Sequence, residues 1–201
     1  MRDWIAYITI IFISVACSRE PGKVETVEQQ VAFIQRPEHG LHKKQECEVN
    51  TVELSYKPTQ QLVMQEMGTT VDPVLCDSLK RNYDKYMYFI MTVTPAAGHK
   101  LYEPLESMQQ YYDLVQTLAF RMNEYVSAKV GDKRVYSKAT YFDQLYGITN
   151  SLSCMIVFDR AELQEETSFS ISIKEFGLRT GICAFEFSND DINNCPIIEK
   201  K

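Results

Sequence analysis

The stretch YMYFIMTVT, residues 86–94, is the strongest strand signal in this chain. Aromatic and β-branched residues dominate it, and these residue types favour extended backbone. Pro95-Ala96-Ala97-Gly98 follows directly and ends the run. We therefore expect a domain built on a sheet to which residues 86–94 belong.

The next segment, residues 104–128, has the spacing of an amphipathic helix. Pro104 suits a first helical turn, and Gly131-Asp132 marks the other end. Apolar residues recur every three or four positions and predict one buried stripe. Its members are Leu105, Met108, Tyr112, Val115, Ala119, Met122 and Val126.

Alternating runs on both sides of this helix predict the remaining strands: residues 49–56, 134–141, 152–158, 169–173 and 181–187. The last four follow each other at hairpin spacing, which indicates an antiparallel meander. Their predicted inward side chains include Leu152, Cys154, Ile156, Phe158, Cys183, Phe185 and Phe187. Shorter helices are expected over residues 24–34, over residues 72–80 and from residue 189 or 190. The predicted fold class is α+β, with an antiparallel β-sheet of about five to six strands packed against one long amphipathic helix.

The N-terminus reads as an export signal. Residues 4–15 are a twelve-residue apolar stretch, whereas a bilayer-spanning helix needs about 20 residues. Ser14 and Ala16 supply the small residues that signal cleavage before Cys17 requires. This length and these residues predict a cleaved signal peptide.

Ser14-Val15-Ala16-Cys17 also resembles a bacterial lipobox. The resemblance implies that the signal is removed before Cys17, which is then acylated and anchors the chain in a membrane. Two or three acyl chains give stable attachment, and Ser18 after the cysteine is compatible with export to the outer membrane. The alternative is a plain secretory peptide in which Cys17 is incidental. We expect a signal peptide over residues 1–16, a lipid-anchored tether over residues 17–46 and one globular domain over residues 47–201.

Composition excludes one class of partner. The 201 residues carry a net charge of −6, and the sequence pI is about 5.2. Nucleic-acid binding by charge needs a concentrated Lys/Arg surface, and the densest basic cluster is only His42-Lys43-Lys44. We expect no nucleic-acid partner.

The sequence does not decide which cysteines are free thiols and which form disulfides. Five cysteines remain besides Cys17, so at least one thiol is free or forms an intermolecular bond. They are Cys47, Cys76, Cys154, Cys183 and Cys195. Cys154 and Cys183 fall on apolar faces of predicted strands and are expected to be packed thiols, with a bridge between them as the alternative.

Catalytic signatures are weak. The sequence has no G-x-S-x-G, P-loop or G-x-G-x-x-G motif, and it has only three histidines. Paired carboxylates are the one enzymatic alternative, because they need only converge in space. The candidates are Asp143, Asp159, Glu175 and Glu186. We expect a non-enzymatic domain without a cofactor.

Two clusters are candidate binding sites. His39, His42 and Cys47 are soft ligands within nine residues and could bind zinc. Tyr141, Phe142 and Tyr146 form a dense aromatic loop, and aromatic side chains are enriched at interaction surfaces. The sequence thus predicts a cell-envelope lipoprotein that binds an envelope protein or glycan, with a metal-binding lipoprotein or an envelope hydrolase as alternatives.

Overall fold

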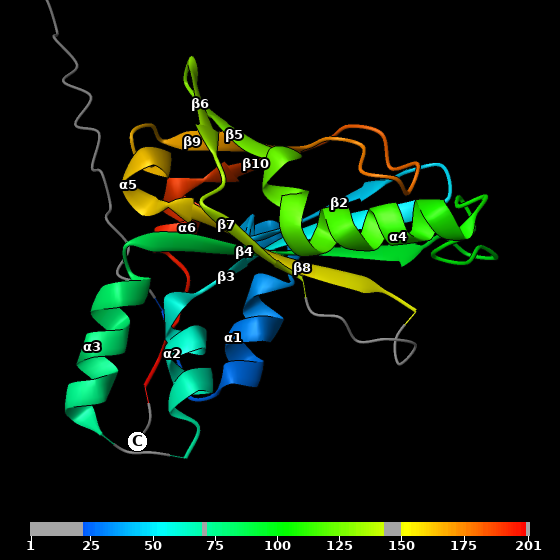
Figure 1. The fold of residues 1–201 in the computed structure, drawn as a ribbon. Helices are drawn as coiled ribbons and strands as arrows, with labels where there is room; N and C mark the ends of the chain where they lie inside the picture. The colour runs from blue at the N-terminus through cyan, green and yellow to red at the C-terminus, as the bar shows by residue number, and fades with distance from the viewer. Residues whose placement is uncertain (1–21, 70–71, 143–149, 200–201) are drawn as a thin grey trace, which may run out of the picture.

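The computed structural model of the protein describes residues 22–69, 72–142 and 150–199, and their fold is α+β (Figure 1). A five-stranded sheet has the order β2-β3-β4-β8-β7, and a four-stranded sheet has the order β10-β9-β5-β6. All neighbouring strands within these two sheets are antiparallel. The strands are β2 (His42–Glu46), β3 (Asn50–Lys57), β4 (Tyr86–Pro95), β5 (Val126–Val130), β6 (Lys133–Tyr136), β7 (Ala139–Phe142), β8 (Leu152–Asp159), β9 (Ser168–Ile173) and β10 (Cys183–Ser188).

The predicted strand at residues 86–94 is confirmed as β4, the middle strand of the larger sheet. Phe89 lies between Tyr56 of β3 and Ile156 of β8 in the register. Since alternate side chains of a strand point to opposite faces, one face of β4 enters the core. That face carries Met87, Phe89, Met91 and Val93, all fully buried.

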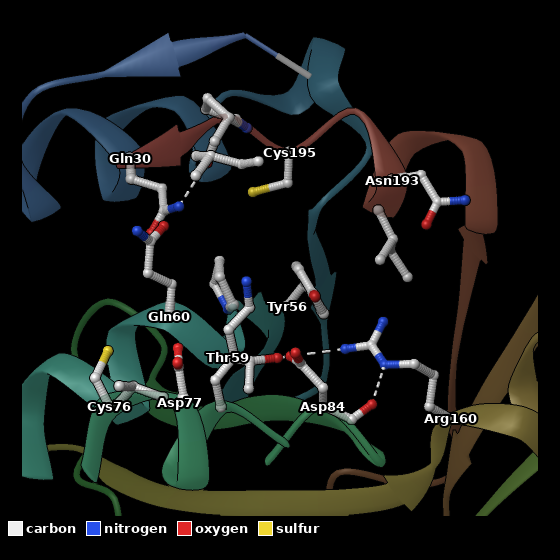
Figure 2. A pocket seen from close by; sticks show the side chains of 16 residues that line it. Gln30, Tyr56, Thr59, Gln60, Cys76, Asp77, Asp84, Arg160, Asn193 and Cys195 are labelled. Carbon is white, nitrogen blue, oxygen red and sulfur yellow. Dashed lines mark hydrogen bonds between the residues drawn. The ribbon is translucent and has the colours of Figure 1, made fainter. Parts of the chain in front are cut away.

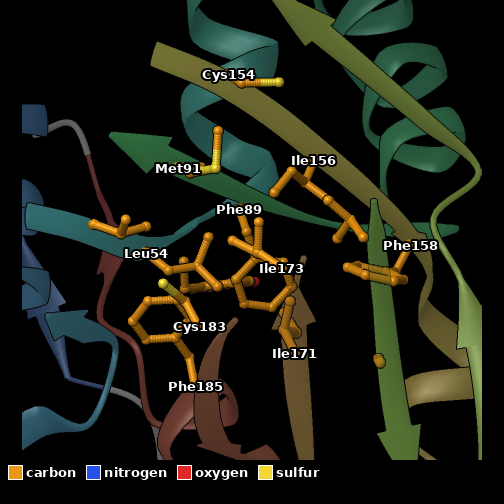
Figure 3. Close-up of a cluster of buried hydrophobic side chains, with 14 of the residues drawn as sticks. Leu54, Phe89, Met91, Cys154, Ile156, Phe158, Ile171, Ile173, Cys183 and Phe185 are labelled. Carbon is orange, nitrogen blue, oxygen red and sulfur yellow. The ribbon is translucent and has the colours of Figure 1, made fainter. Parts of the chain in front are cut away.

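The core lies between the two sheets, with Phe89 at its centre (Figure 3). The Phe89 ring centroid is 5.0 Å from that of Phe187 on β10 and 6.1 Å from that of Phe169 on β9. The inward side chains predicted for residues 152–158 and 181–187 are confirmed as buried. Aromatic packing therefore joins the sheets across the core.

The single long helix predicted over residues 104–128 is wrong. The helical run consists of α4 (Met108–Gln116), a π-helical turn η2 (Thr117–Arg121) and a 3₁₀ turn η3 (Met122–Glu124). Val126 then begins β5, because Gly131-Asp132 is the turn of the β5–β6 hairpin and not a helix end. The buried face carries Leu114, Leu118 and Met122, whereas Met108 is 64% and Tyr112 is 55% exposed.

The predicted four-stranded meander is also wrong. Residues 134–141 divide at Ser137-Lys138 into β6 and β7, which belong to different sheets. β8 lies between β4 and β7 in the five-stranded sheet, whereas β9 and β10 belong to the four-stranded sheet. The predicted strands are therefore divided between the two sheets. Alternation identifies a strand but not its partner: β6 pairs with β5, whereas β7 pairs with β8.

The described part of the expected tether is folded, so its predicted end at residue 46 is wrong. Residues 24–34 do contain the expected helix, α1 (Val27–Ile34), which Thr26 caps by accepting from the Gln29 N–H. Ile34 and Leu41 are buried in the core, and β2 pairs with β3. Burial of these apolar side chains stabilises the segment against the domain.

Further elements complete the described part of the fold. They are β1 (Lys23–Val24), η1 (Pro37–His39), α2 (Thr59–Met67), α3 (Pro73–Tyr83), α5 (Arg160–Leu163), α6 (Asn189–Asn193) and β11 (Ile197–Ile198). β1 and β11 form a short parallel ladder. α1, α2 and α3 group together beside the red segment that contains β11 (Figure 1). Within the described ranges, no helix is long and apolar enough to cross a membrane.

Candidate functional site

A pocket of about 620 Å³ opens between α2, α3 and the segment that follows α6 (Figure 2). Pockets that hold small ligands are typically about 300–1,000 Å³. The end of β3 and the start of α5 complete its lining through Tyr56 and Arg160. Segments far apart in the sequence therefore meet at this site.

Local sequence signals position the two helical walls. Lys57-Pro58 ends β3, and α2 starts at Thr59 directly afterwards. Asp72 caps α3 by accepting from the N–H groups of Val74 and Leu75, and Pro73 occupies its first turn. The apolar part of the lining consists of Pro58, Val63, Ile192, Pro196 and Ile197.

Side-chain amides fix the C-terminal wall. Gln60 accepts from the Ile198 N–H at 2.8 Å and donates to the Ile198 carbonyl oxygen at 2.6 Å. Buried Gln30 donates to the Pro196 carbonyl oxygen and accepts from Gln61 Nε2. Hydrogen bonds from Gln30 and Gln60 thus pair backbone groups of this wall at Pro196 and Ile198.

Arg160 supplies the fixed positive charge of the pocket. Its Nε donates to the Asp84 carbonyl oxygen at 2.8 Å, and its Nη2 donates to the Tyr86 carbonyl oxygen at 3.2 Å and to Thr59 Oγ1 at 3.4 Å. All three acceptors are neutral oxygens. Across the described residues, no carboxylate forms an ion pair with Arg160.

The guanidinium group of Arg160 faces the cavity next to Tyr56 (Figure 2). Burial raises the pKa of the Tyr56 hydroxyl, and the positive charge of Arg160 only partly opposes this rise. The hydroxyl therefore stays protonated near neutral pH and can donate a hydrogen bond. Burial also raises the pKa of the Cys195 thiol to about 12.

The pocket combines a cation with apolar walls. Lys80, Asp77 and Asp84 add further charges at the α3 side of the lining. An arginine that backbone carbonyls hold in place loses little freedom when it binds an anion. The arrangement is suited to a ligand with an anionic group on an apolar body.

The structure does not assemble the predicted zinc ligands. The His39 ring stacks on Phe33 with 3.5 Å between centroids, His42 Nδ1 hydrogen-bonds with Ser55 Oγ, and Cys47 Sγ lies 3.8 Å from Cys183 Sγ. In the part of the chain that the structure describes, no three His, Cys, Asp or Glu side chains are grouped to hold a metal. Each predicted ligand has a separate partner instead.

The predicted carboxylates do not line this pocket. Asp159 caps α5 by accepting from the Ala161 N–H, and Glu175 accepts hydrogen bonds from the loop that follows it. Glu186 is exposed on β10, and Asp143 lies outside the described residues. The carboxylates in the lining are Asp77 and Asp84, which the sequence analysis did not select.

The predicted aromatic surface is described only in part. Tyr141 is 60% exposed on the edge strand β7, while Phe142 packs against the core. Tyr146 lies outside the described residues, as does Cys17. Partner binding through Tyr141 stays a prediction, and Phe142 has a packing role.

Sequence reasoning missed the pocket because its lining comes from five separate stretches of chain. Arg160 begins the short helix α5 directly after β8, a context that many solvated arginines share. No protein-family model and no curated protein matches this sequence.

Proposed function

We propose that this protein is a lipid-anchored component of the bacterial cell envelope whose domain binds an anionic ligand in the pocket beside Arg160. One observation carries the binding proposal: a half-buried arginine faces a cavity of about 620 Å³, and its described acceptors are all neutral. A ligand carboxylate or phosphate would supply the missing negative charge. Charge-assisted hydrogen bonds of this kind are about twice as strong as neutral ones.

The apolar walls of the pocket indicate that the ligand also has an apolar part. Val63, Ile192 and Ile197 come from three different elements and face the same cavity. Apolar surface gains roughly 25 cal/mol per Å² when it leaves water. An envelope component with an acidic group on a hydrocarbon or aromatic body satisfies both halves of the pocket.

The anchoring proposal rests on Ser14-Val15-Ala16-Cys17. Acyl chains on Cys17 would attach the domain to a membrane, and Ser18 is compatible with the outer membrane. Attachment keeps a binding domain at the envelope, where its ligand or a partner protein or glycan would be met.

The anchor is tested by intact mass and membrane fractionation of the full chain and of Cys17→Ala. We expect the mature protein to start at Cys17, to carry acyl mass and to fractionate with membranes. Cys17→Ala should lose the acyl mass and the membrane association. Cys76→Ala is the matched control and should keep both. An unmodified, soluble wild-type chain would refute the anchor.

Ligand binding is tested with anilinonaphthalene sulfonate, a fluorescent apolar anion, titrated into the folded protein. We expect one saturable site whose affinity falls about tenfold in Arg160→Gln, the equivalent of about 1.4 kcal/mol for a charge-assisted hydrogen bond. Arg121→Gln is the control, because Arg121 is exposed and pairs with Glu124 outside the pocket.

A second variant tests the pocket without changing Arg160, so that a folding defect in Arg160→Gln would not decide the result. Cys76 lies in the lining on α3 and is partly exposed, so Cys76→Trp should fill the cavity without removing a core contact. Binding that survives both pocket variants would refute the proposed site. Melting curves of each variant establish that the compared proteins are folded.

A further inference from the structure

Two cysteines distant in sequence face each other where the two sheets meet. Cys47 follows β2 and Cys183 begins β10, and their sulfur atoms are 3.8 Å apart. β2 is an edge strand of the five-stranded sheet, and β10 is an edge strand of the four-stranded sheet. The pair therefore lies at a junction between the sheets and is independent of the pocket.

The surrounding backbone holds the two thiols in this position. The Cys47 N–H donates to the Asn50 carbonyl oxygen at 2.8 Å, which closes the turn between β2 and β3. Gln45 connects the two edges, because its Nε2 donates to the Ile182 carbonyl oxygen and its Oε1 accepts from the Ala184 N–H.

The geometry points to a covalent modification: we propose that Cys47 and Cys183 form a disulfide that joins the edges of the two sheets. A disulfide bond is about 2.05 Å long, so the sulfur atoms must approach by less than about 2 Å. Rotation of the partly exposed Cys47 side chain between rotamers can provide such a movement. This inference goes beyond the proposed ligand binding and does not depend on it.

Exposure sets the order of the chemical steps. Cys47 is partly exposed, and Cys183 is fully buried, so a small disulfide such as oxidised glutathione reaches Cys47 first. The Cys47 thiolate attacks one glutathione sulfur, forms a mixed disulfide and releases one glutathione thiolate, which takes up the Cys47 proton. Cys183 then loses its proton and attacks Cys47 Sγ, which releases the second glutathione. Two protein thiols are oxidised, and one glutathione disulfide is reduced to two thiols.

The second step should be slow at neutral pH. Burial raises the pKa of the Cys183 thiol, and this cause persists when Cys47 is held in the mixed disulfide. Since the thiolate is the nucleophile, closure should accelerate about tenfold for each unit of pH in the range below this pKa.

The other described cysteines have no comparable sulfur neighbour. Within residues 22–69, 72–142 and 150–199, Cys47 and Cys183 form the one hydrogen bond between two cysteine sulfurs. Cys154 donates instead to the Met155 carbonyl oxygen. The structure thus favours Cys47 as the partner of Cys183 over the Cys154–Cys183 bridge that the sequence left open.

The test is oxidation of the purified full-length protein by oxidised glutathione, followed by thiol blocking and peptide mapping by mass spectrometry. We expect a peptide containing Cys47 linked to one containing Cys183, with the loss of two hydrogen atoms. The link should form in wild type and in the control Cys154→Ser, and it should be absent from Cys47→Ser and Cys183→Ala. Oxidised wild type should melt on the order of 10 °C above reduced wild type.

Two variants are used because Cys183 is buried and its replacement could disturb the fold, whereas Cys47→Ser alters a partly exposed position. Cys47 and Cys183 that stay unlinked after oxidation, or a link from Cys183 to Cys154, would overturn the inference. Because the oxidant is supplied in vitro, this result is separate from the membrane fractionation and from the ligand titration.

Discussion

Glu175 organises the loop between β9 and β10 through one carboxylate. Its Oε1 accepts from the N–H groups of Gly177, Leu178 and Arg179, and its Oε2 accepts from the Gly181 N–H. The loop contains Arg179 with φ of 53°, a left-handed conformation that non-glycine residues rarely adopt. The converging hydrogen bonds explain how the loop keeps this conformation.

These hydrogen bonds make the stability of the protein depend on pH. Burial raises the pKa of Glu175, but the hydrogen bonds from Gly177, Gly181, Leu178 and Thr180 outweigh burial, and the pKa is lowered from its ordinary value of 4.5. A carboxyl group whose pKa is lower in the folded state stabilises the fold above its unfolded pKa. That contribution is lost as the pH falls below about 4.5 and through the folded pKa.

Glu175→Gln should therefore lower the free energy of unfolding by about 1–2 kcal/mol at pH 7, a value kept small because the side chain is exposed. The difference from wild type should shrink as the pH falls below about 4.5. Urea unfolding at several pH values measures both effects. Glu186→Gln, at an exposed carboxylate on β10, is the control and should have little effect. A Glu175→Gln deficit that persists unchanged at low pH would contradict the explanation.

At the scale of single elements, the helical run after β4 shows which of two apolar stripes is buried. Leu114 and Leu118, which lie outside the predicted stripe, face the core together with Met122, which both stripes share, whereas Met108 and Tyr112 of the predicted stripe face solvent. Both stripes satisfy helical periodicity, so periodicity alone could not distinguish them. The following hairpin decided the outcome, because the chain from Val126 onward pairs as β5 and β6.

Leu118→Ala should lower the free energy of unfolding by about 2–4 kcal/mol, since it removes a buried side chain from the core. Met108→Ala should change it by less than about 0.5 kcal/mol, as is usual at an exposed position. Chemical denaturation of the two variants beside wild type compares the faces directly. A larger loss in Met108→Ala would show that the predicted stripe is the buried one.

Strands with an apolar face could be predicted from the sequence because their alternation is local. β3, β4, β8, β9 and β10 all match predicted segments to within a residue or two. Pairing is a different question, since it depends on contacts between distant residues. Nothing within residues 134–141 indicated that the chain changes sheets at Ser137-Lys138.

Gln60 on α2 is expected to control the order of β11. Its side chain forms both hydrogen bonds to the backbone of Ile198. Gln60→Ala should therefore increase amide hydrogen exchange at Ile198 at least tenfold, the equivalent of about 1.4 kcal/mol for two net hydrogen bonds. Gln65→Ala is the control, because Gln65 accepts from Lys57 Nζ at an exposed site. Equal exchange in the two variants would contradict this role.

At the scale of the whole molecule, the domain includes the segment that the sequence assigned to a tether. Leu41 is fully buried, and β2 covers one edge of β3. The predicted boundary at residue 47 failed because residues 22–46 contain one short helix and a polar strand, HKKQE, without strong apolar alternation. A single apolar residue without an apolar pattern around it, such as Leu41, gives no local signal of burial, because tertiary contacts decide whether it is buried.

A chain that begins at residue 47 should therefore not fold cooperatively. It lacks α1 and β2, leaves β3 as an exposed edge and opens the core at Ile34 and Leu41. Circular dichroism should show a broad, non-cooperative melt, whereas a chain that begins at residue 22 should melt in one transition. A sharp transition for the shorter chain would restore the predicted boundary.

The candidate site could not be predicted at all, for a related reason. Tyr56, Arg160 and Cys195 are more than thirty residues apart in sequence and converge only in the folded protein. Their residue types carry no spacing signal that distinguishes them from ordinary core and surface residues. A binding site of this kind becomes visible only when the topology is known.

The parallel pairing of β1 with β11 has a consequence for the order of events during synthesis. Lys23 opposite Ile197 joins the beginning of the described chain to its end, and closing so long a loop is entropically slow. Residues 192–197, which form one wall of the pocket, leave the ribosome after nearly all of the remaining domain. A growing chain therefore lacks this wall of the pocket, and the cavity is complete only after residues 192–197 have emerged.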